Sequence, residues 1–213
     1  MTNFIPVFPL ELVVYPGETV NLHIFEPRYK QLIQEYSANG KPFGISVIID
    51  QQPKEFGASV VVSEVVERYE DGSMDIRVTG QKVFRILELI KQVPDKMYSG
   101  AIVTYLSYDP VHYPDHMRDL FIKIQELYKL LNVQKKFTKP VEEMVSFDIA
   151  HHIGLQIKQE YELLELNKEL ERLEYIRRHI TQMIQVLQQG ESLKEKIQLN
   201  GHFRELKGFN FDF

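Results

Sequence analysis

The chain has 213 residues, of which 44% are hydrophobic and 26% charged, and it contains no cysteine. This composition is that of an ordinary globular protein, and it excludes a disulfide scaffold, a thiolate zinc site and a cysteine nucleophile. The formal net charge of -5 argues against a general nucleic-acid binder, which carries a basic field. Because no apolar run reaches about 18 to 20 residues and the N-terminus lacks a basic, apolar leader, we expect a soluble cytoplasmic protein without a membrane span.

The first half, residues 1–110, is predicted to be a β domain. It holds eight of the ten prolines, and its short apolar runs are rich in Val and Ile, which favour strands. The sequence predicts a helix from Pro27 to about Gly40, and Asp71-Gly72 predicts a hairpin because this pair tolerates positive φ. Six strands are expected, at 5–10, 20–24, 44–49, 58–69, 73–89 and 100–108. Hairpin connections between them indicate a small antiparallel sheet, twisted or closed into a barrel.

The second half is rich in Leu, Glu, Lys and Gln at helical spacing. We expect a helical subdomain over residues 111–190, followed by a tail over 191–213. The predicted helices cover 115–131, 141–152, 156–165 and 168–189. The apolar seam of the last helix predicts packing on its own domain, with a self-associating coiled coil as the alternative.

Motifs for common enzyme chemistry are missing. The sequence has no G-x-x-x-x-G-K-[ST] phosphate loop, no G-x-S-x-G elbow and no H-E-x-x-H pair, so we expect no enzyme activity and no cofactor. His112 and His116 have metal-ligand spacing, but Pro114 between them interrupts a shared helix face, so no metal site is expected. The basic cluster Lys135, Lys136 and Lys139 is interpreted as a solvated connector, with a phosphate site as the alternative.

Residues 7–33 carry the most specific pattern in the chain. A Pro-Leu strand, a Pro-Gly turn and an apolar strand lead into the run Ile24-Phe25-Glu26-Pro27-Arg28-Tyr29. This stretch resembles the opening of the Lon N-terminal domain, also called the LON substrate-binding domain, in the form found in stand-alone bacterial members. The likeness extends over about residues 3–188, through Phe43-Gly44-Ile45, the Asp71-Gly72 hairpin and, more loosely, the segment 159–173.

The resemblance implies an α+β fold, in which a PUA-like antiparallel β-barrel is followed by a helical bundle. It also implies a non-catalytic module that binds unfolded or apolar-tagged polypeptides, in protein quality control and in partnership with a separate protease or chaperone. A Lon protease would continue after about residue 190 into ATPase and Ser–Lys protease domains, whereas this chain ends at Phe213. The alternative is an RNA-binding PUA-like module, which a continuous basic strip on the barrel would favour.

Three aromatic residues are candidate peptide anchors: Phe25, Tyr29 and Phe43. The competing interpretation is that they fill the interface between barrel and helix. The tail carries four more candidates for an interaction, Phe203, Phe209, Phe211 and Phe213, of which the last three alternate. Period-two aromatics suit a strand added to a sheet edge, and the alternatives are a strap on the chain's own surface or a disordered tail.

Overall fold

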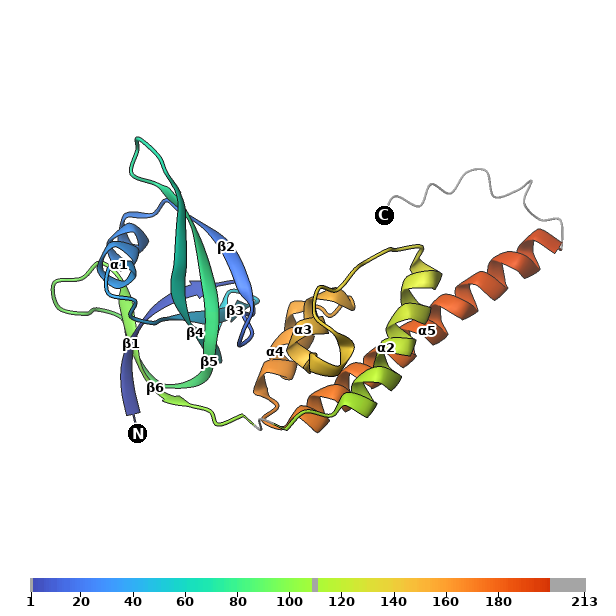
Figure 1. Cartoon of the computed structure of the whole chain (residues 1–213). Coiled ribbons are helices and arrows are strands. Elements are labelled where there is room, and N and C mark those ends of the chain that lie inside the picture. The colour runs from blue at the N-terminus through green and yellow to red at the C-terminus, as the bar shows by residue number, and fades with distance from the viewer. Residues whose placement is uncertain (1, 109–110, 200–213) are drawn as a thin grey trace. The chain divides into compact units, whose positions relative to one another are not determined.

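The computed structural model describes residues 2–108 and 111–199, with the backbone alone for Thr2 and 191–199. Their elements are drawn in Figure 1. The chain divides into two compact units. Unit 1 contains the residues up to His112 together with Val145–Arg172, and unit 2 contains Tyr113–Met144 and the chain from Leu173 onward. The tail candidates Phe203, Phe209, Phe211 and Phe213 lie outside the described residues.

The N-terminal part of unit 1 is built on six strands and one helix, which lies between the second and third strands in the sequence. The strands are β1 (Thr2–Leu10), β2 (Thr19–Ile24), β3 (Phe43–Ile49), β4 (Gln52–Arg68), β5 (Met74–Ile90) and β6 (Ser99–Tyr105), and the helix is α1 (Pro27–Ser37). The predicted hairpin joins β4 to β5, and Gly72 there has φ +77°. Its amide donates to the Tyr69 carbonyl, which closes the turn.

Five of the strands pair in a ring. β1 pairs with β3, β3 with β4, β4 with β5, β5 with β6, and β6 with β1, while β2 pairs only with the first part of β5 among the described strands. The β1–β3 pairing is parallel, and the other pairings are antiparallel. The expected barrel is therefore mixed rather than wholly antiparallel, because β2 and α1 between these strands let the chain return in the same direction.

Alternating side chains divide the apolar residues of this sheet into two clusters. One cluster packs against α1 and contains Phe8, Tyr29, Phe43, Ile45 and Ile76 among others. The second contains Ile5, Val7, Phe84, Ala101 and Val103. Neighbouring residues of one strand, such as Val7 and Phe8, therefore contribute to different clusters, as the period of two requires.

Unit 1 also contains α3 (Ser146–Ile149), η2 (Ala150–His152) and α4 (Ile157–Glu165). The sequence interpretation grouped these residues with the other helices, whereas the structure groups them with the strands. The predicted helix over 141–152 is also broken, because Met144 and Val145 have extended backbone with ψ of 147° and 167°. The Val145 amide donates to the Asp148 carboxylate, 2.8 Å away, which starts α3 at this point.

Unit 2 contains α2 (Pro114–Leu131), η1 (Val141–Glu143) and most of α5 (Glu169–Leu199). Both long helices bury an apolar face, which includes Leu120 and Ile124 of α2 and Ile176 and Ile180 of α5. α2 lies across α5 in Figure 1, and Gln188 donates to Glu126 between them. The seam of α5 thus packs within its own unit. None of the helices described is long and apolar enough to cross a membrane.

Candidate functional site

The structure separates the three predicted peptide anchors. Phe25 is 61% exposed, whereas Tyr29 is 4% exposed and Phe43 is fully buried. Tyr29 stacks on Phe8 with ring centroids 3.8 Å apart, because α1 turns its Tyr29, Leu32 and Ile33 side toward the sheet. Tyr29 and Phe43 therefore belong to the core and cannot anchor a peptide at the surface, which corrects that part of the prediction. Only Phe25 of the three remains a candidate.

The histidines considered for metal binding are not brought into a cluster. His116 meets the ring of Tyr113 edge-on at 5.7 Å. Within the part of the chain that the structure describes, no group of three or more His, Cys, Asp or Glu residues could hold a metal ion.

An apolar depression of about 330 Å³ opens on unit 1. Its apolar lining comes from β1, β3, β4 and β5, and β6 adds Ser99. Val7 belongs to the second apolar cluster and Ile86 packs against that cluster, so the depression leads from the interior to the surface. The apolar side chains that line it are Val7, Pro9, Ile48, Pro53, Ile86 and Leu89.

The lining of this apolar depression also includes charged residues. Lys54 and Glu55 belong to its lining, and Glu55 forms an ion pair of 2.8 Å with Arg85. The guanidinium of Arg85 also lies 5.9 Å from the ring of Phe56. The Phe56 amide in turn donates to the hydroxyl of Tyr161 on α4, so the helical segment of unit 1 is fastened beside the depression. A mostly apolar lining with a few polar groups is typical of sites that bind apolar ligands in a fixed orientation.

A second surface lies at the other end of β4, where polar and aromatic side chains gather on the outer face of the sheet. His23, Asp75 and Glu67 are directly paired across β2, β5 and β4, so their side chains form one row. His23 Nδ1 lies 2.6 Å from Asp75 Oδ1. The hydroxyl of Tyr69 donates to Asp75 at 2.6 Å and to Glu67 at 3.2 Å. The ring of Phe25 stacks on His23 at 5.9 Å. We name these five residues the acidic–aromatic patch.

The electrostatics of the acidic–aromatic patch keep Asp75 charged. Hydrogen bonds from Tyr69 and His23 lower the pKa of the Asp75 carboxyl. The bond to Asp75 also raises the pKa of Tyr69 to about 12, since the carboxylate disfavours a second negative charge. At neutral pH this surface therefore presents the Asp75 carboxylate, the side chain of Glu67, a neutral phenol and two further rings to solvent.

Comparison with known proteins assigns the family. The model of the ATP-dependent protease La (LON) substrate-binding domain matches residues 5–182. The chain belongs to the LON substrate-binding domain family. The match is to this family's substrate-binding domain and not to an ATPase or protease domain.

Among the solved structures that this chain resembles are two Lon N-terminal domains. A Lon N-terminal domain protein from Xanthomonas campestris is 25% identical, with a TM-score of 0.62, over 81% of this chain and 95% of that one. The N-terminal domain of the Mycobacterium avium complex Lon protease is 16% identical, with a TM-score of 0.59, over 84% and 98% of the two chains. The second likeness concerns the fold alone.

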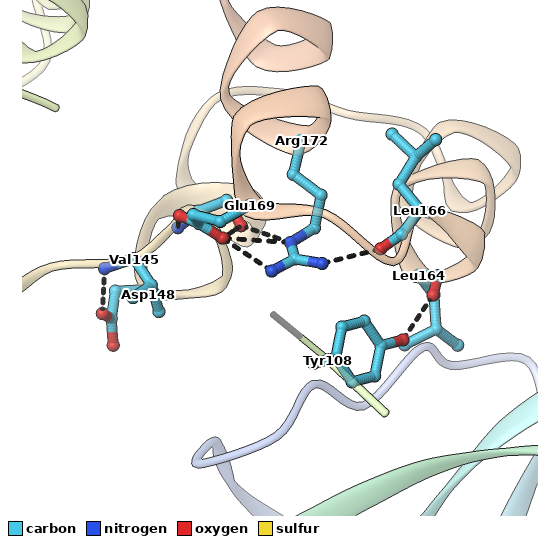
Figure 2. Close-up of polar contacts among 8 residues, drawn as sticks. Tyr108, Val145, Asp148, Leu164, Leu166, Glu169 and Arg172 are labelled. Atoms are coloured by element: carbon cyan, nitrogen blue, oxygen red, sulfur yellow. Dashed lines mark hydrogen bonds and ion pairs between the residues drawn. The ribbon is translucent and has the colours of Figure 1, made fainter. Parts of the chain in front are cut away.

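In this LON domain a buried polar cluster fixes the segment Val145–Arg172 (Figure 2). Arg172 donates to Glu169 at 2.7 Å and to the Leu166 carbonyl at 2.6 Å, and both charged side chains are almost fully buried. Glu169 in turn accepts from the amide and hydroxyl of Ser146. Tyr108, at the end of the barrel, donates to the Leu164 carbonyl at 2.7 Å. Each end of the segment is thus held by hydrogen bonds rather than by apolar packing alone.

Sequence reasoning missed both surfaces apart from Phe25. The lining of the apolar depression is drawn from five strands, and no local motif marks its members. The alternation of side chains along β1 and β3 gave a partial indication. It places Val7, Pro9, Ser46 and Ile48 on the opposite face of the strands from Phe8 and Phe43. The row of His23, Asp75 and Glu67 depends on the register of three strands, which the sequence does not specify.

Proposed function

We propose that this LON domain binds exposed apolar segments of unfolded or apolar-tagged polypeptides, as a recognition module in protein quality control. The observation that carries the proposal is the apolar depression of about 330 Å³, which is within the size range of ligand sites. Family membership supports the same reading, because the matching family is described as a substrate-binding domain.

The chemistry of the apolar depression sets the expected strength of binding. Burial of apolar surface contributes roughly 25 cal/mol for each Å², so about 200 Å² in the complex contributes about 5 kcal/mol before the costs of ordering. This contribution alone corresponds to a Kd of about 0.2 mM, so the affinity from this contact is expected to be no tighter than that. Because apolar burial depends little on ionic strength, binding is expected to survive moderate salt.

Leu89 provides the test, since it lines the apolar depression and is 41% exposed, so a change there does not open the core. The probe is a fluorescein-labelled leucine-rich peptide, titrated at about 50 and 200 mM salt and followed by anisotropy. Leu89→Glu is expected to weaken binding at least tenfold. Its matched control is Leu87→Glu on the same strand, 52% exposed and outside the lining, which is expected to bind like the parent protein.

A structured RNA titrated in parallel separates the proposal from the RNA-binding alternative. Binding to phosphates falls steeply between about 50 and 200 mM salt, whereas apolar binding does not. Salt-sensitive RNA binding without any response to the peptide would refute the proposal. Equal effects of Leu87→Glu and Leu89→Glu would place the peptide elsewhere.

One further variant tests whether the phenylalanine residues of the tail contribute to peptide binding. A chain that ends at residue 200 lacks Phe203, Phe209, Phe211 and Phe213. If the tail contributes to binding, this variant is expected to bind the peptide with altered affinity, and an unchanged affinity removes the tail from the proposal.

A further inference from the structure

The β4–β5 hairpin beside the acidic–aromatic patch carries an excess of negative charge. Residues 67–75 contain four carboxylates, Glu67, Glu70, Asp71 and Asp75, against one cation, Arg68. The neighbouring Arg and Lys side chains pair elsewhere: Arg77 pairs with Glu64, Arg28 pairs with Glu26, and the ammonium of Lys30 donates to the backbone carbonyl of Asp71. Asp75 has His23 as its partner, with Nδ1 2.6 Å away, and Glu67 accepts only from the Tyr69 hydroxyl among the described residues. The hairpin therefore carries a net negative charge, and most of its charged residues are exposed.

Aromatic rings stand within this acidic surface. Phe25 is 61% exposed and Tyr69 is 39% exposed. The ring of His23 lies between them, 5.9 Å from each ring centroid. Exposed rings beside carboxylates attract cations in two ways, because the ring face is negative and the carboxylates are charged.

We propose that the acidic–aromatic patch binds a basic segment of a polypeptide partner. A Lys or Arg side chain of the partner lies over Phe25 or Tyr69 and pairs with Glu67 or Asp75, and an adjoining apolar side chain of the partner covers the remainder of the Phe25 ring. The complementarity of charge selects this occupant. An acidic peptide or a nucleic acid would meet like charges at Glu67, Glu70 and Asp75.

This site is separate from the apolar depression. The depression uses Pro53, Lys54 and Glu55 near the start of β4, whereas the patch uses Glu67 and Tyr69 at and just beyond its end. The proposal therefore does not depend on the proposed function, and the variant Leu89→Glu is expected to leave this binding unchanged.

Three short labelled peptides test the proposal on the full chain: one alternating Lys and Phe, one alternating Lys and Ser, and one alternating Glu and Phe. Anisotropy titrations of the Leu89→Glu chain, in which binding at the apolar depression is weakened, are expected to give binding in the order Lys-Phe, then Lys-Ser, with Glu-Phe the weakest. Phe25→Ala is expected to weaken Lys-Phe binding about two- to fivefold, as for one exposed cation–π contact. Glu67→Gln is expected to weaken binding of both lysine peptides, and rising salt to weaken it further.

Matched controls use the far end of β5. Leu87→Ala removes an exposed apolar side chain, and Glu88→Gln neutralises an exposed carboxylate, both away from the patch. Both are expected to bind the Lys-Phe peptide like the parent. Because Glu67 is exposed, Glu67→Gln keeps the test valid even if another variant misfolds.

Several outcomes would overturn the proposal. Equal binding of the Glu-Phe and Lys-Phe peptides would show that charge does not select the partner. Unchanged binding in both Phe25→Ala and Glu67→Gln would place the lysine peptides elsewhere. Concentration-dependent dimers in sedimentation, lost in Phe25→Ala, would identify a second copy of the chain as the occupant, and salt-sensitive RNA binding at the patch would contradict the charge argument.

Discussion

Glu18 and His151 are 133 residues apart in the sequence, and their side chains meet at a distance of 3.1 Å. The other ring nitrogen of His151 lies 2.7 Å from Glu160, and its ring lies 4.8 Å from that of Tyr15. Glu18 and Tyr15 belong to the loop between β1 and β2, whereas His151 and Glu160 belong to the helical segment of unit 1. The imidazole thus joins the segment 145–172 to the strands.

The first prediction concerns pH. Burial disfavours the charged form of His151, but the bonds to Glu160 and Glu18 outweigh it and raise its pKa to about 9, above the ordinary value of 6.5. Because the folded pKa is the higher one, this stabilisation is fully present below about pH 6.5 and is lost as pH rises through about 9. Between about pH 6.5 and 9, the free energy of unfolding of the parent in urea should therefore fall by about 2 to 3 kcal/mol more than that of His151→Gln.

The control for this measurement is His116→Gln, which changes an exposed histidine in α2. It is expected to keep the pH dependence of the parent. The difference between parent and His151→Gln is the quantity to follow, because other groups also titrate at alkaline pH. Parallel curves for these two proteins would show that the raised pKa of His151 does not stabilise the fold.

The second prediction concerns the buried pair of Glu169 and Arg172. The guanidinium lies 4.5 Å from the Phe147 ring and 4.9 Å from the Tyr108 ring, in addition to its bonds with Glu169. Arg172→Met leaves a buried carboxylate without its cation, so it should lower the free energy of unfolding by about 3 to 5 kcal/mol. The double variant Glu169→Gln/Arg172→Met should recover part of this loss, because no buried charge remains.

An exposed ion pair serves as the comparison. Glu174 bonds to Arg177 and Arg178, which lower its pKa to about 2. Since these groups are solvated, Glu174→Gln should change stability far less than Arg172→Met. Urea titrations followed by circular dichroism provide both values, and similar losses in the two variants would contradict the assignment of Arg172 as a buried structural cation.

The local features of the fold could be predicted from the sequence, whereas its long-range features could not. Asp71-Gly72 and Pro27 specify a turn and a helix start by their own backbone preferences, and the structure confirms both. The parallel pairing of β1 with β3 and the contact of Ser146 with Glu169, 23 residues away, depend on segments that are distant in the sequence. Periodicity showed that one side of α1 is buried, but it could not tell an exposed Phe25 from a buried Tyr29.

The third prediction concerns Gly80 of β5, where the backbone closely approaches the loop between β1 and β2. The amide of Gly80 donates to the Glu18 carbonyl at 2.8 Å, and a Cβ at Gly80 would lie 2.1 Å from the Tyr15 carbonyl oxygen. Gly80→Ala must move backbone and should cost about 2 to 3 kcal/mol of stability.

The matched substitution is Gly190→Ala in α5, where a Cβ meets nothing within 4 Å. It should stabilise the protein by about 0.5 to 1 kcal/mol, because alanine is the better helix former. The midpoint temperatures of thermal unfolding of the two variants should therefore shift in opposite directions from that of the parent. A shift in the same direction would show that the approach at Gly80 relaxes without cost.

The last prediction separates the core aromatic residues from the surface one. Phe43 is fully buried in the cluster against α1, so Phe43→Ala removes a large side chain and leaves a cavity. The expected loss is about 3 to 5 kcal/mol in urea unfolding. Phe25→Ala, at an exposed position, should change stability by less than about 0.5 kcal/mol. If Phe25→Ala instead unfolds the chain, the exposed ring is structural, and the acidic–aromatic patch loses the residue that its peptide test depends on.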